Sequence, residues 1–268
     1  MSAAPTTAAA IREHYDSLAL VYRTYWGDHI HHGLFETGEE TASAAQIHML
    51  EHCLSLLPQR QWQNVFDVGC GHGGTSNFLA QRFGCNVTGM TVSEKQQRIA
   101  TENAVKSGVG ERAKFIVSNA DHYDFPVNSR DLVWTMESSE HFADKSKYFP
   151  KVANMLEPGG CLMLAAWTGD MAHPKVKEIA RQFLCPEFWT PEQYRASLEG
   201  SGLRILHQKD VTAKVLRTWE ICRDHAKLAG PAVLLLPKAA REFIAGIDTI
   251  LDGYRSRDFT YTLFAAQK

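Results

Sequence analysis

The chain has 268 residues, of which 44% are hydrophobic, 10% aromatic and 22% charged, and its formal net charge is −2. This length and composition fit one large globular domain and exclude disordered, collagen-like and disulfide-stapled mini-protein classes. Because 28 basic residues balance 30 acidic ones without a long run of one sign, the charge does not favour a general nucleic-acid or anionic-membrane surface.

The sequence also bears on the compartment. The N-terminus lacks the basic and apolar regions of a secretory signal, and no apolar stretch approaches the roughly 20 residues of a membrane span. Six scattered cysteines without C-x-x-C spacing favour reduced thiols over a disulfide framework or a zinc site. We therefore expect a cytoplasmic protein with no membrane span and no metal ion.

The first 60 residues carry helical patterns. Apolar residues recur at three- and four-residue spacing between Ile11 and Tyr22, which predicts a helix over residues 7–25. A second helix is expected over residues 39–57, because Pro58 cannot continue it.

From residue 61 onward, short β-branched runs alternate with helical patterns. Strands are expected at 64–68, 86–90, 114–117, 131–136 and 161–166, with helices at 75–83, 93–106 and 144–156. Glu157-Pro-Gly-Gly160 is expected to form a turn before the fifth strand. This alternation predicts right-handed βαβ units and a parallel sheet with helices on both faces.

After residue 168 longer helical stretches replace the alternation. Helices are expected at 174–184 and 191–200, a strand at 203–210 and a helical insertion at 214–253. Residues 258–264 alternate in polarity, which predicts an edge or antiparallel strand at the end of the chain.

A glycine-rich stretch, Asp67-Val-Gly-Cys-Gly-His-Gly-Gly74, directly follows the first expected strand. Three of its glycines match G-x-G-x-x-G, so a nicotinamide-dependent oxidoreductase is one candidate. Asp67 argues against it, because a carboxylate beside the ligand would repel a pyrophosphate but would suit an ammonium group. The acidic ribose-binding residue that a dinucleotide fold places about 20 residues farther on is also missing.

Several motifs resemble known families. Three of them, in family order and spacing, resemble class I S-adenosylmethionine-dependent methyltransferases: Asp67-Val-Gly-Cys-Gly71, Asn119-Ala-Asp121 and Leu156-Glu-Pro-Gly-Gly160. Three others resemble the γ-tocopherol methyltransferase-like group: Trp26-Gly-Asp-His-Ile-His-His-Gly33, Gly89-Met-Thr-Val-Ser93 and Trp134-Thr-Met-Glu-Ser-Ser-Glu-His141.

The resemblance implies a Rossmann-like α/β fold. Its seven-stranded sheet would be mostly parallel with an antiparallel last strand and helices on both faces, plus an N-terminal helical lid and a C-terminal helical cap insertion. A single domain over residues 1–268 would comprise a lid (1–60), a cofactor-binding core (61–168), cap helices with strand 203–210 (169–257) and the last strand (258–268).

The resemblance also implies S-adenosyl-L-methionine as cofactor. Gly69 and Gly71 would pack under it, and Asp67 would organise its amino-acid end. The other implied cofactor-binding residues are Met90, Thr91, Gln96, Asn119, Ala120, Asp121, Glu137, Tyr22 and Trp26. Simpler interpretations remain, namely that Asp67 and Asp121 only cap backbone and that the aromatic residues only fill the core.

Glu140 and His141 follow the fourth strand, at the sheet edge where open α/β folds bind ligands. Because an ordinary histidine pKa is about 6.5, His141 is a candidate general base, although the pair is equally placed to cap the next element. Residues that would contact substrate or form the lid are Tyr15, His31, His32, Trp167, Trp189 and Trp219.

The sequence thus predicts an enzyme that transfers a methyl group to oxygen, nitrogen or carbon of a small, partly apolar metabolite, in specialised or secondary metabolism. The alternatives are an NAD(P)-dependent oxidoreductase and a cofactor-binding module without activity. No nucleic-acid partner is expected, and the oligomeric state stays open.

Overall fold

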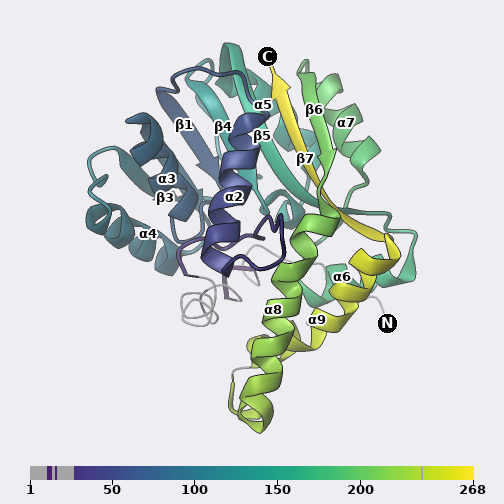
Figure 1. The fold of residues 1–268 in the computed structure, drawn as a ribbon. Helices are drawn as coiled ribbons and strands as arrows, with labels where there is room; N and C mark the ends of the chain where they lie inside the picture. Colours follow the sequence, from purple (N-terminus) through teal and green to yellow (C-terminus); the bar gives the residue numbers. More distant parts are fainter. Residues whose placement is uncertain (1–10, 14–15, 17–26, 237) are drawn as a thin grey trace.

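The computed structural model describes residues 11–13, 16, 27–236 and 238–268, and a seven-stranded sheet forms its centre (Figure 1). The strands are β1 (Asn64–Val68), β2 (Asn86–Thr91), β3 (Ala113–Val117), β4 (Arg130–Met136), β5 (Leu156–Gly169), β6 (Arg204–Asp210) and β7 (Phe259–Gln267). Their order is β3-β2-β1-β4-β5-β7-β6, and β7 runs antiparallel to both of its neighbours. The predicted mostly parallel sheet with an antiparallel last strand is confirmed.

Eight α-helices are described around this sheet. They are α2 (Ala42–Ser55), α3 (Gly74–Phe83), α4 (Glu94–Lys106), α5 (Lys145–Met155), α6 (Pro174–Gln182), α7 (Pro191–Gly200), α8 (Thr212–Ala229) and α9 (Lys238–Ser256). Two short 3₁₀ helices, η1 (Ser139–His141) and η2 (Gly230–Leu235), complete the described elements. Most of the helix expected over 7–25, including Tyr15 and Tyr22, lies outside the described residues, as does Trp26.

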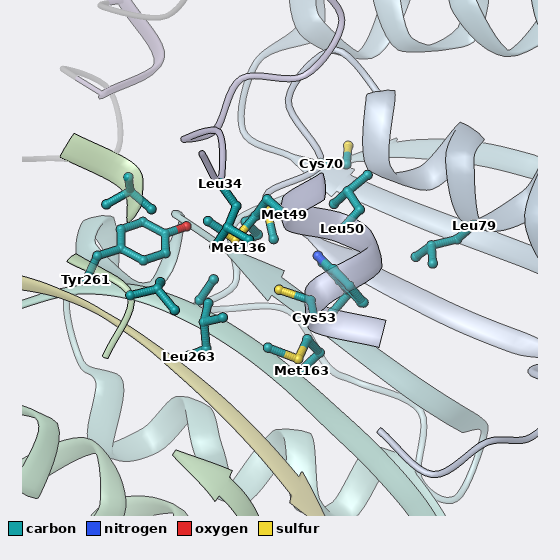
Figure 2. Close-up of a cluster of buried hydrophobic side chains, with 14 of the residues drawn as sticks. Leu34, Met49, Leu50, Cys53, Cys70, Leu79, Met136, Met163, Tyr261 and Leu263 are labelled. Atoms are coloured by element: carbon teal, nitrogen blue, oxygen red, sulfur yellow. The ribbon is translucent and has the colours of Figure 1, made fainter. Parts of the chain in front are cut away.

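Each face of the sheet buries its own core because successive side chains of a strand point to opposite faces. In β1, Val65 belongs to the core shared with α2, α3 and α4, whereas Phe66 belongs to the core shared with α5 and α7. Figure 2 shows the first core where Met49, Leu50 and Cys53 of α2 meet strand residues.

The expected turn at 157–160 is wrong in one respect, because the structure places it inside β5. Leu156 already pairs with Arg130, and the register then shifts so that Leu132 pairs with Cys161. Gly159, at φ 78°, accommodates this irregularity, and its N–H donates to the carbonyl of Lys268. The chain end thus extends the ladder past the glycines, a contact that local sequence does not reveal.

The expected insertion at 214–253 is two helices. Gly230, at φ 51°, ends α8, and Pro231 lies at the start of η2, where its missing N–H costs nothing. The helices α8 and α9 form a hairpin that projects away from the sheet (Figure 1). None of the helices in the described ranges is long and apolar enough to cross a bilayer.

Candidate active site

A pocket of about 850 Å³, including its open mouth, lies at the carboxyl ends of β1, β2 and β4. The sheet order reverses between β1 and β4, which is where open α/β sheets bind ligands. Among the described residues, the walls include most of the expected cofactor-binding residues together with His141. They are Gly69, Gly71, Met90, Thr91, Gln96, Asn119, Ala120, Asp121, Glu137 and His141.

Gly69 lets the end of β1 approach the segment after β4. Its φ is 84°, and a Cβ at this position would lie 2.2 Å from the Cβ of Ser138. Ser138 Oγ donates a hydrogen bond of 2.7 Å to the carbonyl of Val68. Glycine is therefore required here both by backbone conformation and by space.

Asp67 lies in a smaller hollow of about 300 Å³ that shares Gly69 and Gly71 with the main pocket. Its carboxylate is buried and accepts a hydrogen bond of 2.6 Å from Ser76 Oγ. Burial raises the pKa of Asp67 to about 6, against the opposing effect of Ser76. An ammonium group in this hollow would compensate the desolvated carboxylate.

Two histidines also line or flank this hollow. Burial lowers the pKa of His29 to about 3, with a further contribution from His31, and burial likewise lowers the pKa of His31. Both rings are neutral near pH 7 and so supply no positive charge to Asp67. The hollow therefore suits a cationic ligand group.

At the end of β2, Thr91 Oγ1 donates a 2.6 Å hydrogen bond to Gln96 Oε1, and both side chains are buried. Ser93 caps α4 by accepting from the Gln96 N–H at 3.0 Å. An uncharged Thr–Gln pair thus stands at the end of β2, where the acidic ribose-binding residue of a dinucleotide fold is missing.

At the end of β3, Asn119 Oδ1 accepts from the Asp121 N–H at 2.9 Å. The carboxylate of Asp121 accepts from the N–H of Ala143 at 3.1 Å and 3.3 Å. This carboxylate caps no helix; it joins the loop after β3 to the loop after η1, and both loops line the pocket.

Glu137 is a half-buried residue on the pocket wall that accepts several hydrogen bonds, and its φ of 50° is one that non-glycine residues rarely adopt. Its Oε1 accepts from the His32 N–H and the Tyr261 hydroxyl, both at 2.7 Å. Its Oε2 accepts from His32 Nδ1 at 2.9 Å and Trp167 Nε1 at 3.1 Å. Burial opposes ionisation, but His32, whose backbone N–H and ring Nδ1 both hydrogen-bond to this carboxylate, lowers the pKa of Glu137 to about 2.

His32 continues this network away from the pocket. Its Nε2 accepts a hydrogen bond of 2.6 Å from Trp219 Nε1 and lies 3.2 Å from the Tyr254 hydroxyl. Because an indole N–H can only donate, Nε2 carries no proton and Nδ1 donates its proton to Glu137. The ring is thus a neutral tautomer held between two partners.

The expected substrate or lid residues that the structure describes do not line the main pocket. His32, Trp167 and Trp219 belong to the network behind Glu137, and His31 faces the smaller hollow. Trp189 packs near Phe149 and Tyr194 in the core on the other face of the sheet.

Glu140 and His141 are adjacent but differ in position. Glu140 is buried, accepts from the Trp167 N–H at 2.5 Å, and is not among the described residues that line the pocket. Burial raises the pKa of Glu140 to about 8, so this carboxyl is protonated at neutral pH.

His141 lies on the pocket wall, where its Nδ1 is 3.3 Å from the carbonyl oxygen of Leu184. Cys185 Sγ lies 3.9 Å from the same Nδ1. A carbonyl can only accept, so in the tautomer that donates from Nδ1 to Leu184 the basic nitrogen is Nε2. Leu184 has a φ of 54°, a strained conformation for a bulky residue, and strain of this kind clusters at functional sites.

Sequence reasoning missed several residues that build the site. Tyr261 and Tyr254 reach Glu137 and His32 across 124 and 222 positions of the chain, and Leu184 reaches His141 across 43. No local motif marks these partners, because the fold alone brings them together. Ser76 was within reach of prediction, since it lies one turn into the helix that follows the glycine loop.

Comparisons with known proteins identify the family of the chain. Residues 3–217 match the family described as mycolic acid cyclopropane synthetase, so the chain belongs to this family of class I S-adenosylmethionine-dependent methyltransferases. The chain is 27% identical over 277 residues to a "Probable tocopherol O-methyltransferase, chloroplastic" of Oryza sativa subsp. japonica, covering 95% of this chain and 76% of the relative. It is 33% identical over 193 residues to the 2-methyl-6-phytyl-1,4-hydroquinone methyltransferase of Synechocystis, covering 67% of this chain and 60% of the relative.

A solved structure shows the same fold. The cyclopropane synthase MmaA2 from Mycobacterium tuberculosis superposes with a TM-score of 0.86 over 100% of both chains, at 16% identity. The family match and the curated relatives, not this likeness in fold, show that the protein is an S-adenosylmethionine-dependent methyltransferase, so the predicted cofactor and enzyme class are confirmed.

Proposed function

We propose that this methyltransferase of the mycolic acid cyclopropane synthetase family methylates a hydroxyl oxygen of a small, partly apolar metabolite, with His141 as general base. The observation that carries the proposal is the position of His141 on the pocket wall, with its Nδ1 3.3 Å from the Leu184 carbonyl oxygen. When Nδ1 donates to this carbonyl, Nε2 is the proton acceptor. A hydroxyl acceptor gains most from such a group, because its oxygen is a weak nucleophile until the proton is removed.

The described residues fit the cofactor at three points. Asp67 would bind its ammonium group, Gly69 and Gly71 give it backbone clearance, and Asn119 and Asp121 offer polar atoms to its adenine edge. When bound, the cofactor supplies a methyl group already activated by a positively charged sulfur. The chain itself therefore has to orient the acceptor, exclude water and remove a proton.

His141 would accept the hydroxyl proton on Nε2, which makes the acceptor oxygen more nucleophilic. The carbonyl of Leu184 keeps the ring oriented during this transfer, because Nδ1–H stays bonded to it. Holding the reactants in line contributes up to about 7–11 kcal/mol to such reactions.

The apolar character of the acceptor is supported by the remaining walls. Ile11, Ile30, Met136 and Phe142 line the same pocket as His141. A ring or chain of low polarity would bury against these side chains, with its hydroxyl turned toward the histidine. The names of the rice and Synechocystis relatives, which refer to a tocopherol and a phytylated hydroquinone, support this class of acceptor and a place in specialised metabolism.

The proposal is tested with methyl-labelled cofactor and paired acceptors. A chromanol or phenol with an apolar side chain is compared with its own methyl ether, which lacks the reacting hydroxyl. We expect label on the oxygen of the first compound and no product from the second, as located by mass spectrometry. Label on a ring carbon of both compounds would contradict oxygen methylation while leaving the methyltransferase activity intact.

A further inference from the structure

The tip of the α8–α9 hairpin carries exposed leucines. Leu228, Leu234 and Leu235 are 85%, 70% and 87% exposed, and they are three of the six large hydrophobic residues exposed in the described part of the chain. They lie within eight positions of each other, on α8 and on η2, which contact each other. Soluble proteins rarely leave a cluster of large apolar side chains in water unless the cluster binds something.

The base of the hairpin is well packed, so the exposure is specific to the tip. Trp219 on α8 and Phe243, Ile247 and Ile250 on α9 are buried in the core next to the sheet. Beyond them the two helices extend away from the sheet, and the chain turns at Gly230 (Figure 1). The leucines therefore stand at the far end of an anchored projection.

Basic residues outnumber acidic ones around these leucines, with Arg223, Lys227, Lys238 and Arg241 against Asp224 and Glu242 over residues 223–242. Residues 225–241 contain Lys227, Lys238 and Arg241 and no acidic residue, in a chain whose net charge is −2. All three basic side chains are exposed, and Lys238 Nζ lies 3.6 Å from a carboxylate oxygen of the exposed Glu242. Leucines flanked by basic side chains match an anionic bilayer, where the leucines enter the acyl boundary and the cations contact the headgroups.

The same charges disfavour a second copy as the occupant. Two such tips placed against each other would bring together positive groups without acids between 225 and 241. An anionic lipid surface meets both features at once, because it offers an apolar interior beneath a negative surface.

We propose that the tip formed by Leu228, Leu234 and Leu235, with Lys227, Lys238 and Arg241, docks the protein peripherally on an anionic lipid surface. The helices of the hairpin also reach the active site. Trp219 of α8 and Tyr254 of α9 bind His32, which binds Glu137 on the pocket wall. Docking would thus hold the methyltransferase site at a fixed position above the lipid. This inference does not depend on which atom is methylated.

The experiment is flotation of the full-length protein with vesicles. One set contains only phosphatidylcholine, and the other is an equimolar mixture of phosphatidylcholine and phosphatidylglycerol. We expect binding to the anionic vesicles that falls at high salt and is weak on the neutral ones. The double variant Leu234→Ser, Leu235→Ser should bind at least about tenfold more weakly, because two leucines no longer enter the apolar boundary.

Two further variants separate the contribution of the basic side chains to binding from that of the leucines. Lys227→Gln and Lys238→Gln should each weaken binding about fivefold, and only on the anionic vesicles. Val127→Ser is the matched control, because Val127 is exposed to 67%, much like Leu234, but lies in the loop before β4. It should bind like the unaltered protein. Circular dichroism and affinity for S-adenosylhomocysteine should not change in any of these variants.

Three results would overturn the proposal. The first is equal binding of the leucine variant and the unaltered protein to anionic vesicles. The second is no binding of the unaltered protein to either vesicle. The third is a concentration-dependent dimer in sedimentation that disappears in the leucine variant without any lipid binding, which would assign the tip to a second copy instead.

Discussion

The indole N–H of Trp219 donates a hydrogen bond of 2.6 Å to Nε2 of His32, and so fixes on which nitrogen the His32 proton resides. That proton points at the carboxylate of Glu137, which lines the cofactor pocket. A residue of the cap helix α8 thereby sets the hydrogen bonding of a residue on the pocket wall. Stability and cofactor binding should both respond when this bond is removed.

Trp219→Phe removes the indole N–H and keeps an aromatic ring in the cluster. We expect it to lower the free energy of unfolding by about 1–2 kcal/mol, because a buried acceptor on His32 loses its shortest bond. Urea unfolding measures this loss. Trp189→Phe, in the core on the other face of the sheet, is the control and should lower the free energy of unfolding by less. An equal loss in both variants would show that the volume of the ring, and not the hydrogen bond, matters at Trp219.

Binding of S-adenosylhomocysteine, which keeps the ammonium group, should depend on the protonation of Asp67. The pKa of Asp67 in the free protein is about 6, and an ammonium group binds only the ionised carboxylate. Affinity should therefore be constant above pH 6 and fall about tenfold for each pH unit below it. Calorimetry between pH 5 and 8 measures this affinity. The Asp67→Asn variant should bind weakly, and its affinity should not fall below pH 6. A fall in affinity below pH 6 that persists in Asp67→Asn would show that another group titrates there.

Glu140→Gln should alter the pH dependence of stability. The pKa of Glu140 in the folded protein is about 8, above its ordinary value of 4.5, with burial as the main cause. A raised carboxyl pKa means that stability is full below pH 4.5 and is lost progressively as the pH rises toward 8. Glutamine copies the protonated form and can still accept from the Trp167 N–H.

The two proteins should therefore be similarly stable near pH 5. At pH 8 the Glu140→Gln variant should be the more stable one, by an amount on the order of 2–4 kcal/mol. Urea titrations at both pH values provide the test. A variant that is less stable than the unaltered protein at pH 8 would show that Glu140 acts as a charged group.

His141→Ala should lower the rate of the chemical step about 10²–10⁴-fold on a hydroxyl acceptor, which is the usual contribution of acid–base catalysis. The loss should come with little change in affinity for S-adenosylhomocysteine, and the acid limb of the rate should disappear. Single-turnover kinetics separate the two effects. A weaker cofactor affinity with an unchanged chemical step would make His141 a binding residue.

Two glycines of the loop after β1 form a matched pair. Both have positive φ, so alanine should cost about 1–2 kcal/mol at either position. A Cβ at Gly71 would meet Ile30 at an ordinary 3.5 Å, whereas one at Gly69 would clash with Ser138. Gly69→Ala should therefore cost about 1–3 kcal/mol more than Gly71→Ala in urea unfolding. Equal losses in the free energy of unfolding would mean that the segment after β4 shifts to accommodate the added methyl group.

The sequence by itself determined the sheet and the floor of the pocket. Strands and helices alternate with clear periodicity, and the motifs at Asp67, Asn119 and Asp121 lie at strand ends, which topology brings to one edge. These features are local, since a strand, a glycine turn and a capped helix are each specified within a few residues. That is why the strand ends that line the pocket could be predicted from the sequence, while the roles of the residues there came from the resemblance to methyltransferases.

Only the tertiary structure decided how the groups around that floor behave. Glu137, Glu140 and His141 lie within five positions, yet Glu137 is an ionised hub, Glu140 is a protonated buried carboxyl and His141 faces the pocket. Their partners Tyr261, Trp167 and Leu184 come from distant segments. Desolvation and hydrogen bonding set a pKa, and both depend on which distant atoms surround the group.

The exposure of the hairpin tip likewise could not be predicted from the sequence. A net charge of −2 averages over the whole chain and gives no sign of an exposed apolar tip among basic residues. The run Val233–Leu236 is equally consistent with a buried core segment when it is read alone. Only the packing of α8 against α9 leaves Leu234 and Leu235 in water among basic side chains, because burial is a property of the assembled chain and not of its sequence windows.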